Sequence, residues 1–128
     1  MSIKLLVADD SQCMLSAMRH VLEEEPQIEI VGEARTFPVV LEMIANFKPD
    51  VLLLDLRLAQ NDGFTADFVK PQLDAVKNVV AVSFANDPEA QDLAKRYGAR
   101  VLLDKMNLYA EMVPTILHSC EVHQPIIE

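Results

Sequence analysis

The sequence is poor in glycine and cysteine, with three glycines and two cysteines among 128 residues. The segment ADDSQCM at 8–14, which follows the first apolar run, contains no glycine. This disfavours a flavodoxin-like cofactor binder, because such a protein needs a Ser/Thr/Gly-rich loop around a phosphate. Cys13 and Cys120 lie far apart and neither has a second cysteine near it, so we expect neither a zinc site nor a disulfide framework.

Long apolar runs and an excess of positive charge are also missing. No run approaches the roughly 18 apolar residues that span a bilayer, and Asp9 comes too early for a signal peptide, so we expect a cytoplasmic protein without membrane association. The chain has 11 Lys and Arg residues against 20 Asp and Glu residues, a net charge of −9. Such a chain repels phosphate backbones, which excludes nucleic acid as a direct partner.

Five short apolar runs recur along the chain, and segments with helical spacing lie between them. Most of the runs are continuously apolar, as in strands that helices cover on both faces. We therefore predict an α/β fold, a doubly wound five-stranded parallel sheet in three layers. At this length we expect one domain over residues 1–123 and a frayed tail at 124–128. The five runs are Ile3–Ala8, Ile28–Val31, Val51–Leu54, Val79–Val82 and Val101–Leu103.

Capping residues and prolines indicate where the helices begin and end. The N-cap candidates are Ser11, Thr36, Asp87 and Asn107. We expect the first helix to run to about Glu25, before Pro26, and the helix after Asp87 to end at Gly98. Pro71 interrupts the pattern at 64–76, which predicts a short or kinked helix there.

Polar residues follow the apolar runs at their carboxyl ends, where open α/β sheets bind ligands. Asp9 and Asp10 follow the first run, Asp55 the third, Ser83 the fourth and Lys105 the fifth. If the strand order is 2-1-3-4-5, the first and third strands are neighbours and their carboxylates converge. Asp10 alone could instead cap the next helix, and the other residues are individually common at strand ends.

Three converging carboxylates raise one another's pKa values unless a cation lies among them. All-oxygen ligation with open positions suits Mg²⁺, which favours sites that phosphate oxygens complete. The Lys105 amine and the Ser83 hydroxyl would then bind phosphoryl oxygens, while the Asp55 carboxylate attacks phosphorus. The sequence therefore predicts a phosphoacceptor site.

Motifs along nearly the whole chain resemble the receiver domains of bacterial response regulators. The motifs are VADDS at 7–11, LLLDLRL at 52–58 with DG at 62–63, VAVS at 80–83 and LLDK at 102–105. The resemblance implies a flavodoxin-like strand order 2-1-3-4-5. It implies that Asp9 and Asp10 bind the metal, that Asp55 accepts phosphate, and that Ser83 and Lys105 contact it. It also implies that the main-chain carbonyl of Arg57 ligates the metal.

The resemblance further implies partners and a limited chemistry. The phosphodonor would be a sensor histidine kinase or a histidine phosphotransfer protein, and the chain would catalyse only its own phosphorylation and dephosphorylation. An output partner or a second copy would bind the fourth and fifth expected helices. The residues that we expect on this surface are Lys95, Arg96, Tyr97, Tyr109 and Met112.

Several residues depart from the family pattern. Leu102 stands where receivers place a switching Tyr or Phe, and Met106 stands where a proline is frequent. Phe84 follows Ser83 where a small residue is usual, so its ring would narrow access to Asp55. Arg57 could pair with a carboxylate and slow hydrolysis of the acyl phosphate.

Two other functions stay open. A Mg-dependent phosphatase of the haloacid-dehalogenase type also uses an Asp nucleophile, but it needs a second acid where Arg57 stands. The chain could also be the receiver portion of a longer DNA-binding transcriptional regulator. The segment VGEA at 31–34 is similar to receivers that precede helix-turn-helix domains.

Overall fold

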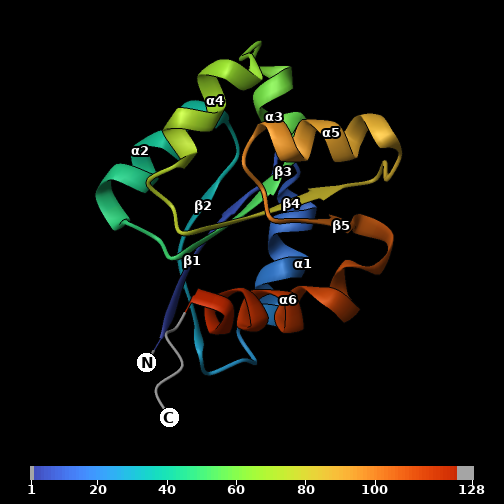
Figure 1. The fold of residues 1–128 in the computed structure, drawn as a ribbon. Coiled ribbons are helices and arrows are strands. Elements are labelled where there is room, and N and C mark those ends of the chain that lie inside the picture. The colour runs from blue at the N-terminus through green and yellow to red at the C-terminus, as the bar shows by residue number, and fades with distance from the viewer. Residues whose placement is uncertain (1, 124–128) are drawn as a thin grey trace.

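Five parallel strands form a single sheet at the centre of the protein. The computed structural model describes residues 2–123, so the expected tail at 124–128 lies outside the described residues. The strands are β1 (Ile3–Ala8), β2 (Ile28–Ala34), β3 (Val51–Asp55), β4 (Asn78–Ser83) and β5 (Val101–Asp104). Their order is β2-β1-β3-β4-β5, which confirms the expected strand order and the parallel sheet (Figure 1).

Helices cover both faces of the sheet. The helices are α1 (Gln12–Leu22), α2 (Phe37–Phe47), α3 (Leu56–Asn61), α4 (Ala66–Leu73), α5 (Pro88–Arg96) and α6 (Leu108–His123), with a 3-10 turn η1 (Lys105–Asn107) before α6. One apolar core packs α1 and α6 against the sheet, and a second core packs α2 to α5 against the opposite face (Figure 1). The predicted three-layer architecture is confirmed.

The two central strands explain the continuously apolar runs. Every residue of β3 and β4 is buried. Side chains alternate between the faces, so Leu52 and Leu54 join the core under α2 to α5, whereas Val51 and Leu53 join the core under α1 and α6. Both faces of these strands must therefore be apolar, and polar side chains stand only at the strand ends, with Asn78 at the amino end of β4 and Asp55 and Ser83 at the carboxyl ends.

Local capping signals predicted most helix starts correctly. The side chains of Ser11, Thr36 and Asp87 accept hydrogen bonds from main-chain N–H groups in the first turns of α1, α2 and α5. Gly98 has a φ of +86° just after α5, as expected for a helix C-terminus. The expected end of the first helix near Glu25 was wrong, because α1 ends at Leu22.

The connection between β3 and β4 contains two helices where the sequence predicted one. Asp55 ends β3 and also caps α3, so this helix begins without any intervening loop. The pattern at 64–76 becomes the eight-residue helix α4, which includes Pro71 near its end. The expectation of a short helix is confirmed, and α3 is the element that the analysis of the sequence missed.

Two residues that we expected on a partner surface are buried. Tyr97 is 1% exposed and Met112 is 0% exposed, whereas Lys95, Arg96 and Tyr109 are exposed. Both buried side chains belong to the apolar cores, so they cannot contact a partner.

None of the helices within residues 2–123 combines the length and the apolar character needed to cross a bilayer.

The hydroxyl of Tyr97 makes a stability prediction possible. Its oxygen is buried and has no hydrogen-bond partner among the described residues. Tyr97→Phe should therefore raise the free energy of unfolding by about 1 kcal/mol, since it removes an unsatisfied polar group and keeps the ring. Urea denaturation measures the change, with Tyr109→Phe on the exposed face of α6 as the control. A loss of stability in Tyr97→Phe alone would show that the hydroxyl is bonded in solution.

Candidate functional site

Three carboxylates meet at the carboxyl edge of the sheet, as the sequence predicted. Asp9 directly follows β1 and Asp55 is the last residue of β3; their exposed fractions are 1% and 3%, whereas Asp10 is exposed. β1 and β3 are paired neighbours, with Ala8 opposite Leu54, which brings the two acids together. One oxygen from each of the three carboxylates lies within 4.8 Å of the others.

The amine of Lys105 lies between the two buried acids. Its Nζ atom is 2.8 Å from Asp9 Oδ2 and 3.2 Å from Asp55 Oδ2, and the Lys105 side chain is only 5% exposed. The ring of Phe84 covers this amine, with 4.9 Å between Nζ and the ring centroid. Lys105 is thus desolvated and positioned by two carboxylates and one aromatic ring.

The pKa shifts at this edge reflect burial and charge. Burial raises the pKa of Asp55 above its ordinary value, although the N–H of Arg57 and the charge of Lys105 act to lower it. Burial acts to lower the pKa of Lys105, but the hydrogen bond to Asp9 and the charges of Asp55 and Asp9 together raise it. The ammonium therefore stays charged at neutral pH, and Asp55 still lacks full compensation of its charge.

The loop from β1 to α1 leaves the Asp10 carboxylate available. Ser11, and not Asp10, caps α1, and Asp9 Oδ1 accepts a hydrogen bond from the Ser11 N–H at 2.9 Å. No hydrogen bond or ion pair engages the Asp10 carboxylate within residues 2–123. The alternative in which Asp10 merely caps a helix is therefore wrong.

Arg35 also contacts this loop, and the analysis of the sequence missed it. The residue follows the last residue of β2, and its Nε and Nη2 atoms donate to the main-chain carbonyl of Asp10 at 3.4 Å and 3.2 Å. A cation one residue past a strand, at the ligand-binding edge of the sheet, was the signal that could have found it.

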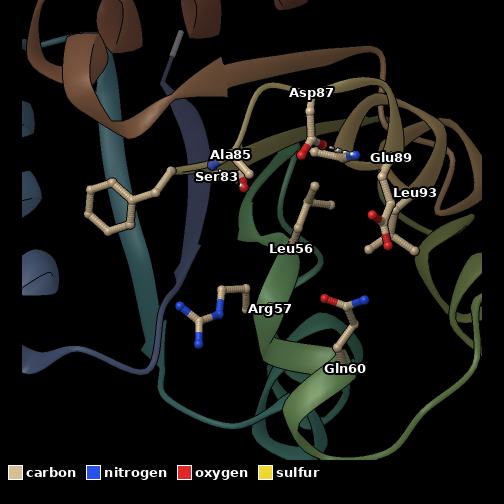
Figure 2. A pocket seen from close by; sticks show the side chains of 10 residues that line it. Leu56, Arg57, Gln60, Ser83, Ala85, Asp87, Glu89 and Leu93 are labelled. Carbon is tan, nitrogen blue, oxygen red and sulfur yellow. Dashed lines mark hydrogen bonds between the residues drawn. The ribbon is translucent and has the colours of Figure 1, made fainter.

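Ser83 lies at the end of β4 beside a cavity of about 230 Å³. Its Oγ atom accepts a hydrogen bond from the Ala85 N–H at 3.0 Å. Figure 2 shows Leu56, Arg57 and Gln60 of α3 on one side of the cavity and the segment from Ser83 to Leu93 on the other. Ser83 is therefore only 4% exposed, yet it lines this cavity together with Leu56 and Arg57, which follow Asp55 in the sequence.

Arg57 is adjacent to the acids through its main chain. Its N–H donates to Asp55 Oδ1 at 3.0 Å, while its side chain is exposed and extends away from Glu89 and Leu93 (Figure 2). The expected ion pair with a carboxylate is not formed with any residue in the described part of the chain. The role of the Arg57 main-chain carbonyl as a metal ligand stays a prediction.

The residues at this edge fit a hard divalent cation. The three carboxylates offer only oxygen atoms, which Mg²⁺ prefers, and the Lys105 ammonium contacts two of them, Asp9 and Asp55. The exposed position of Asp10 leaves one side of the cluster accessible to an ion and its waters.

Comparisons with known proteins agree with this geometry. The chain matches the family described as response regulator receiver domain over residues 5–116. A protein-glutamate methylesterase/protein-glutamine glutaminase of Geobacillus kaustophilus is 32% identical over 133 aligned residues, which cover 95% of this chain and 38% of that protein. The sensory transduction protein LytT of Bacillus anthracis is 34% identical over 83 residues, which cover 65% of this chain and 32% of that protein. The chain thus spans less than two fifths of the length of either relative.

Solved structures share the fold. The signal receiver domain of the response regulator NarL from Mycobacterium tuberculosis has a TM-score of 0.81 at 25% identity, with 96% of this chain and 98% of that one covered. The response regulator domain of Thermotoga maritima CheB also has a TM-score of 0.81, at 21% identity, with 97% and 100% covered. Since the family match extends over most of the chain and the fold agrees, this chain belongs to the response regulator receiver domain family.

Proposed function

We propose that this receiver domain accepts a phosphoryl group on Asp55 while Asp9, Asp10 and Asp55 hold Mg²⁺. The observation that carries the proposal is the Lys105 amine, which bridges Asp9 and Asp55 inside the acid cluster. A buried lysine that bonds two carboxylates at a sheet edge has a direct use when a phosphoryl group arrives. It can release one carboxylate oxygen and bind a phosphoryl oxygen instead.

The chemistry follows from the positions of these groups. An oxygen of Asp55 attacks phosphorus, a new bond forms between them, and the bond from phosphorus to the donor breaks. Bound Mg²⁺ would supply positive charge to the phosphoryl oxygens. Lys105 adds charge from the buried side, and the Ser83 hydroxyl can leave Ala85 and donate to a third oxygen. The main-chain N–H of Arg57 holds the second oxygen of Asp55 in place.

We propose that the phosphodonor is a sensor histidine kinase or a histidine phosphotransfer protein. We further propose that this chain acts as a switch and not as an enzyme that turns over a separate substrate. Against a phosphatase of the haloacid-dehalogenase type, the residue two positions after Asp55 is the exposed Arg57, and it offers no acid for protonating a leaving group. The remaining exposed residues of the expected partner surface, Lys95 and Arg96 of α5 and Tyr109 of α6, leave that face available to an output partner or a second copy.

A longer protein is the second candidate context. The two relatives named above are each more than twice the length that this chain covers, and one is named as a methylesterase and glutaminase. This chain would then regulate an attached output domain, for example a DNA-binding one, through the same phosphorylation.

Phosphorylation with a small donor tests the proposal directly. Incubation with acetyl phosphate and Mg²⁺ should add the mass of one phosphoryl group to the wild-type chain, measured on the intact protein. Asp55→Asn should gain nothing, because the amide cannot attack phosphorus. Asp92→Asn, an exposed aspartate on α5, is the matched control and should behave as the wild type. A chelator should abolish incorporation, and label on Asp55→Asn would refute the assignment.

Arg57 should affect the lifetime of the acyl phosphate. Its guanidinium is exposed beside Asp55 and can reach a phosphoryl oxygen, which would shield the phosphorus from water. Arg57→Ala should speed dephosphorylation by roughly threefold to tenfold, which corresponds to about 0.7–1.4 kcal/mol of barrier. Its free energy of unfolding should change by less than about 0.5 kcal/mol. Gln60→Ala, the next turn of α3, is the control; equal lifetimes in Arg57→Ala and wild type would rule out this role.

The switch should move the loop after β4 more than β5. Leu102 packs against the core under α2 to α5 and has no ring or hydroxyl to reorient, whereas the Ser83 hydroxyl, which accepts from the Ala85 N–H, would turn to donate to a phosphoryl oxygen and disturb that bond. Amide NMR shifts on adding the phosphomimetic BeF₃⁻ should therefore be larger at 84–90 than at 101–104. Equal shifts in the two segments would contradict this pathway.

A further inference from the structure

Arg35 makes a contact that the proposed chemistry leaves unused. Arg35 is exposed and directly follows β2, which is the edge strand beside β1. Its guanidinium does not pair with any of the three carboxylates and instead donates twice to the neutral carbonyl of Asp10. An arginine so close to the acids, yet bonded to a main-chain oxygen, indicates a geometric role.

The tip of β2 holds the β1–α1 loop at two successive residues. The Asp9 N–H donates to the Ala34 carbonyl at 3.0 Å, and the Asp10 carbonyl accepts from Arg35. On the other side of Asp10, the Ser11 N–H is bonded to the Asp9 side chain. The peptide group between Asp10 and Ser11 is therefore restrained at both its N–H and its carbonyl, and without Arg35 this carbonyl would lose its only hydrogen-bond partner within residues 2–123.

The Asp10 side chain depends on this restraint more than the other two acids do. Asp9 and Asp55 are buried and held by Lys105 and by main-chain N–H groups. The Asp10 carboxylate is exposed and has no bond of its own among the described residues, so the only contacts that fix where this side chain leaves the loop are those of its main chain. The planar fork of a guanidinium suits this task, because two of its donors can hold one oxygen.

We propose that Arg35 is a positioning residue, which directs the Asp10 carboxylate toward the divalent cation through the Asp10 carbonyl. The inference rests on the proposed function, because it concerns the same metal site. Removal of a positioning residue and removal of a nearby charge would change the affinity for Mg²⁺ in opposite directions. A guanidinium near the acids repels a cation, so its removal would tighten Mg²⁺ binding if charge alone mattered. If positioning dominates, its removal weakens binding.

Calorimetric titration of the full chain with Mg²⁺ alone separates these effects. Arg35→Ala should raise the Kd for Mg²⁺ about fivefold, which corresponds to about 1 kcal/mol. Arg35→Lys keeps the charge but offers one donor nitrogen in place of two, so its Kd for Mg²⁺ should fall between those of Arg35→Ala and the wild type. Lys95→Ala removes one exposed cation on α5, away from this edge, and should match the wild type. Phosphorylation by acetyl phosphate at saturating Mg²⁺ should stay within about twofold of wild type in Arg35→Ala, since Asp55 and Lys105 are unchanged.

Amide hydrogen exchange without metal gives an independent readout. The Ser11 N–H should exchange faster in Arg35→Ala than in the wild type, whereas amides of the buried strand β3 should exchange at the same rate. An unchanged or lower Kd for Mg²⁺ in Arg35→Ala, with normal binding by the wild type, would overturn the positioning role alone. A wild-type chain that binds no Mg²⁺ would overturn the proposed function and this inference with it.

Discussion

One buried ammonium joins the ends of strands that lie far apart in the sequence. Lys105 follows β5, yet its amine contacts Asp9 after β1 and Asp55 at the end of β3. β4 lies between β3 and β5, so the lysine side chain must extend past the end of β4 to reach them. Two carboxylates excluded from water can stay charged only when a cation compensates them. The strand order therefore creates the site, because it brings the buried carboxylates of Asp9 and Asp55 to the ammonium that compensates their charge.

The rest of the molecule holds this edge rigid. β3 and β4 are buried along their whole length between two apolar cores, so the positions of Asp55 and Ser83 are set by packing on both faces. The polar groups around them belong to short loops and helix starts, where a hydrogen bond can be exchanged at small cost. The bond between Ser83 and Ala85 is one such exchangeable contact, whereas the Arg57 N–H holds one oxygen of Asp55 in place. A packed acid cluster with adjustable neighbours suits the proposed function, in which the domain accepts a phosphoryl group and reports it.

Three cations surround the acids, and each has a different partner. Lys105 is buried against two carboxylates, Arg35 binds a main-chain carbonyl, and the Arg57 side chain has no ion pair in the described part of the chain. The differences follow from where each residue leaves its strand or helix. Lys105 enters the desolvated centre and neutralises charge, whereas the two arginines stay in solvent, where screening weakens their charge and leaves geometry as their main contribution.

The sequence by itself determined the features that depend on neighbouring residues. Continuous apolar runs predicted the strands, Ser11, Thr36 and Asp87 predicted helix starts, and acids at strand ends predicted where three carboxylates meet. Local rules suffice there because capping bonds span three residues and strand burial is visible in each run. Only the tertiary structure decided which face of α5 and α6 is buried, which places Tyr97 and Met112 in the cores. It also decided that Arg35 reaches the Asp10 carbonyl, because that contact depends on how β2 and the β1–α1 loop meet; the position of Arg35 after a strand indicates the edge but not the partner.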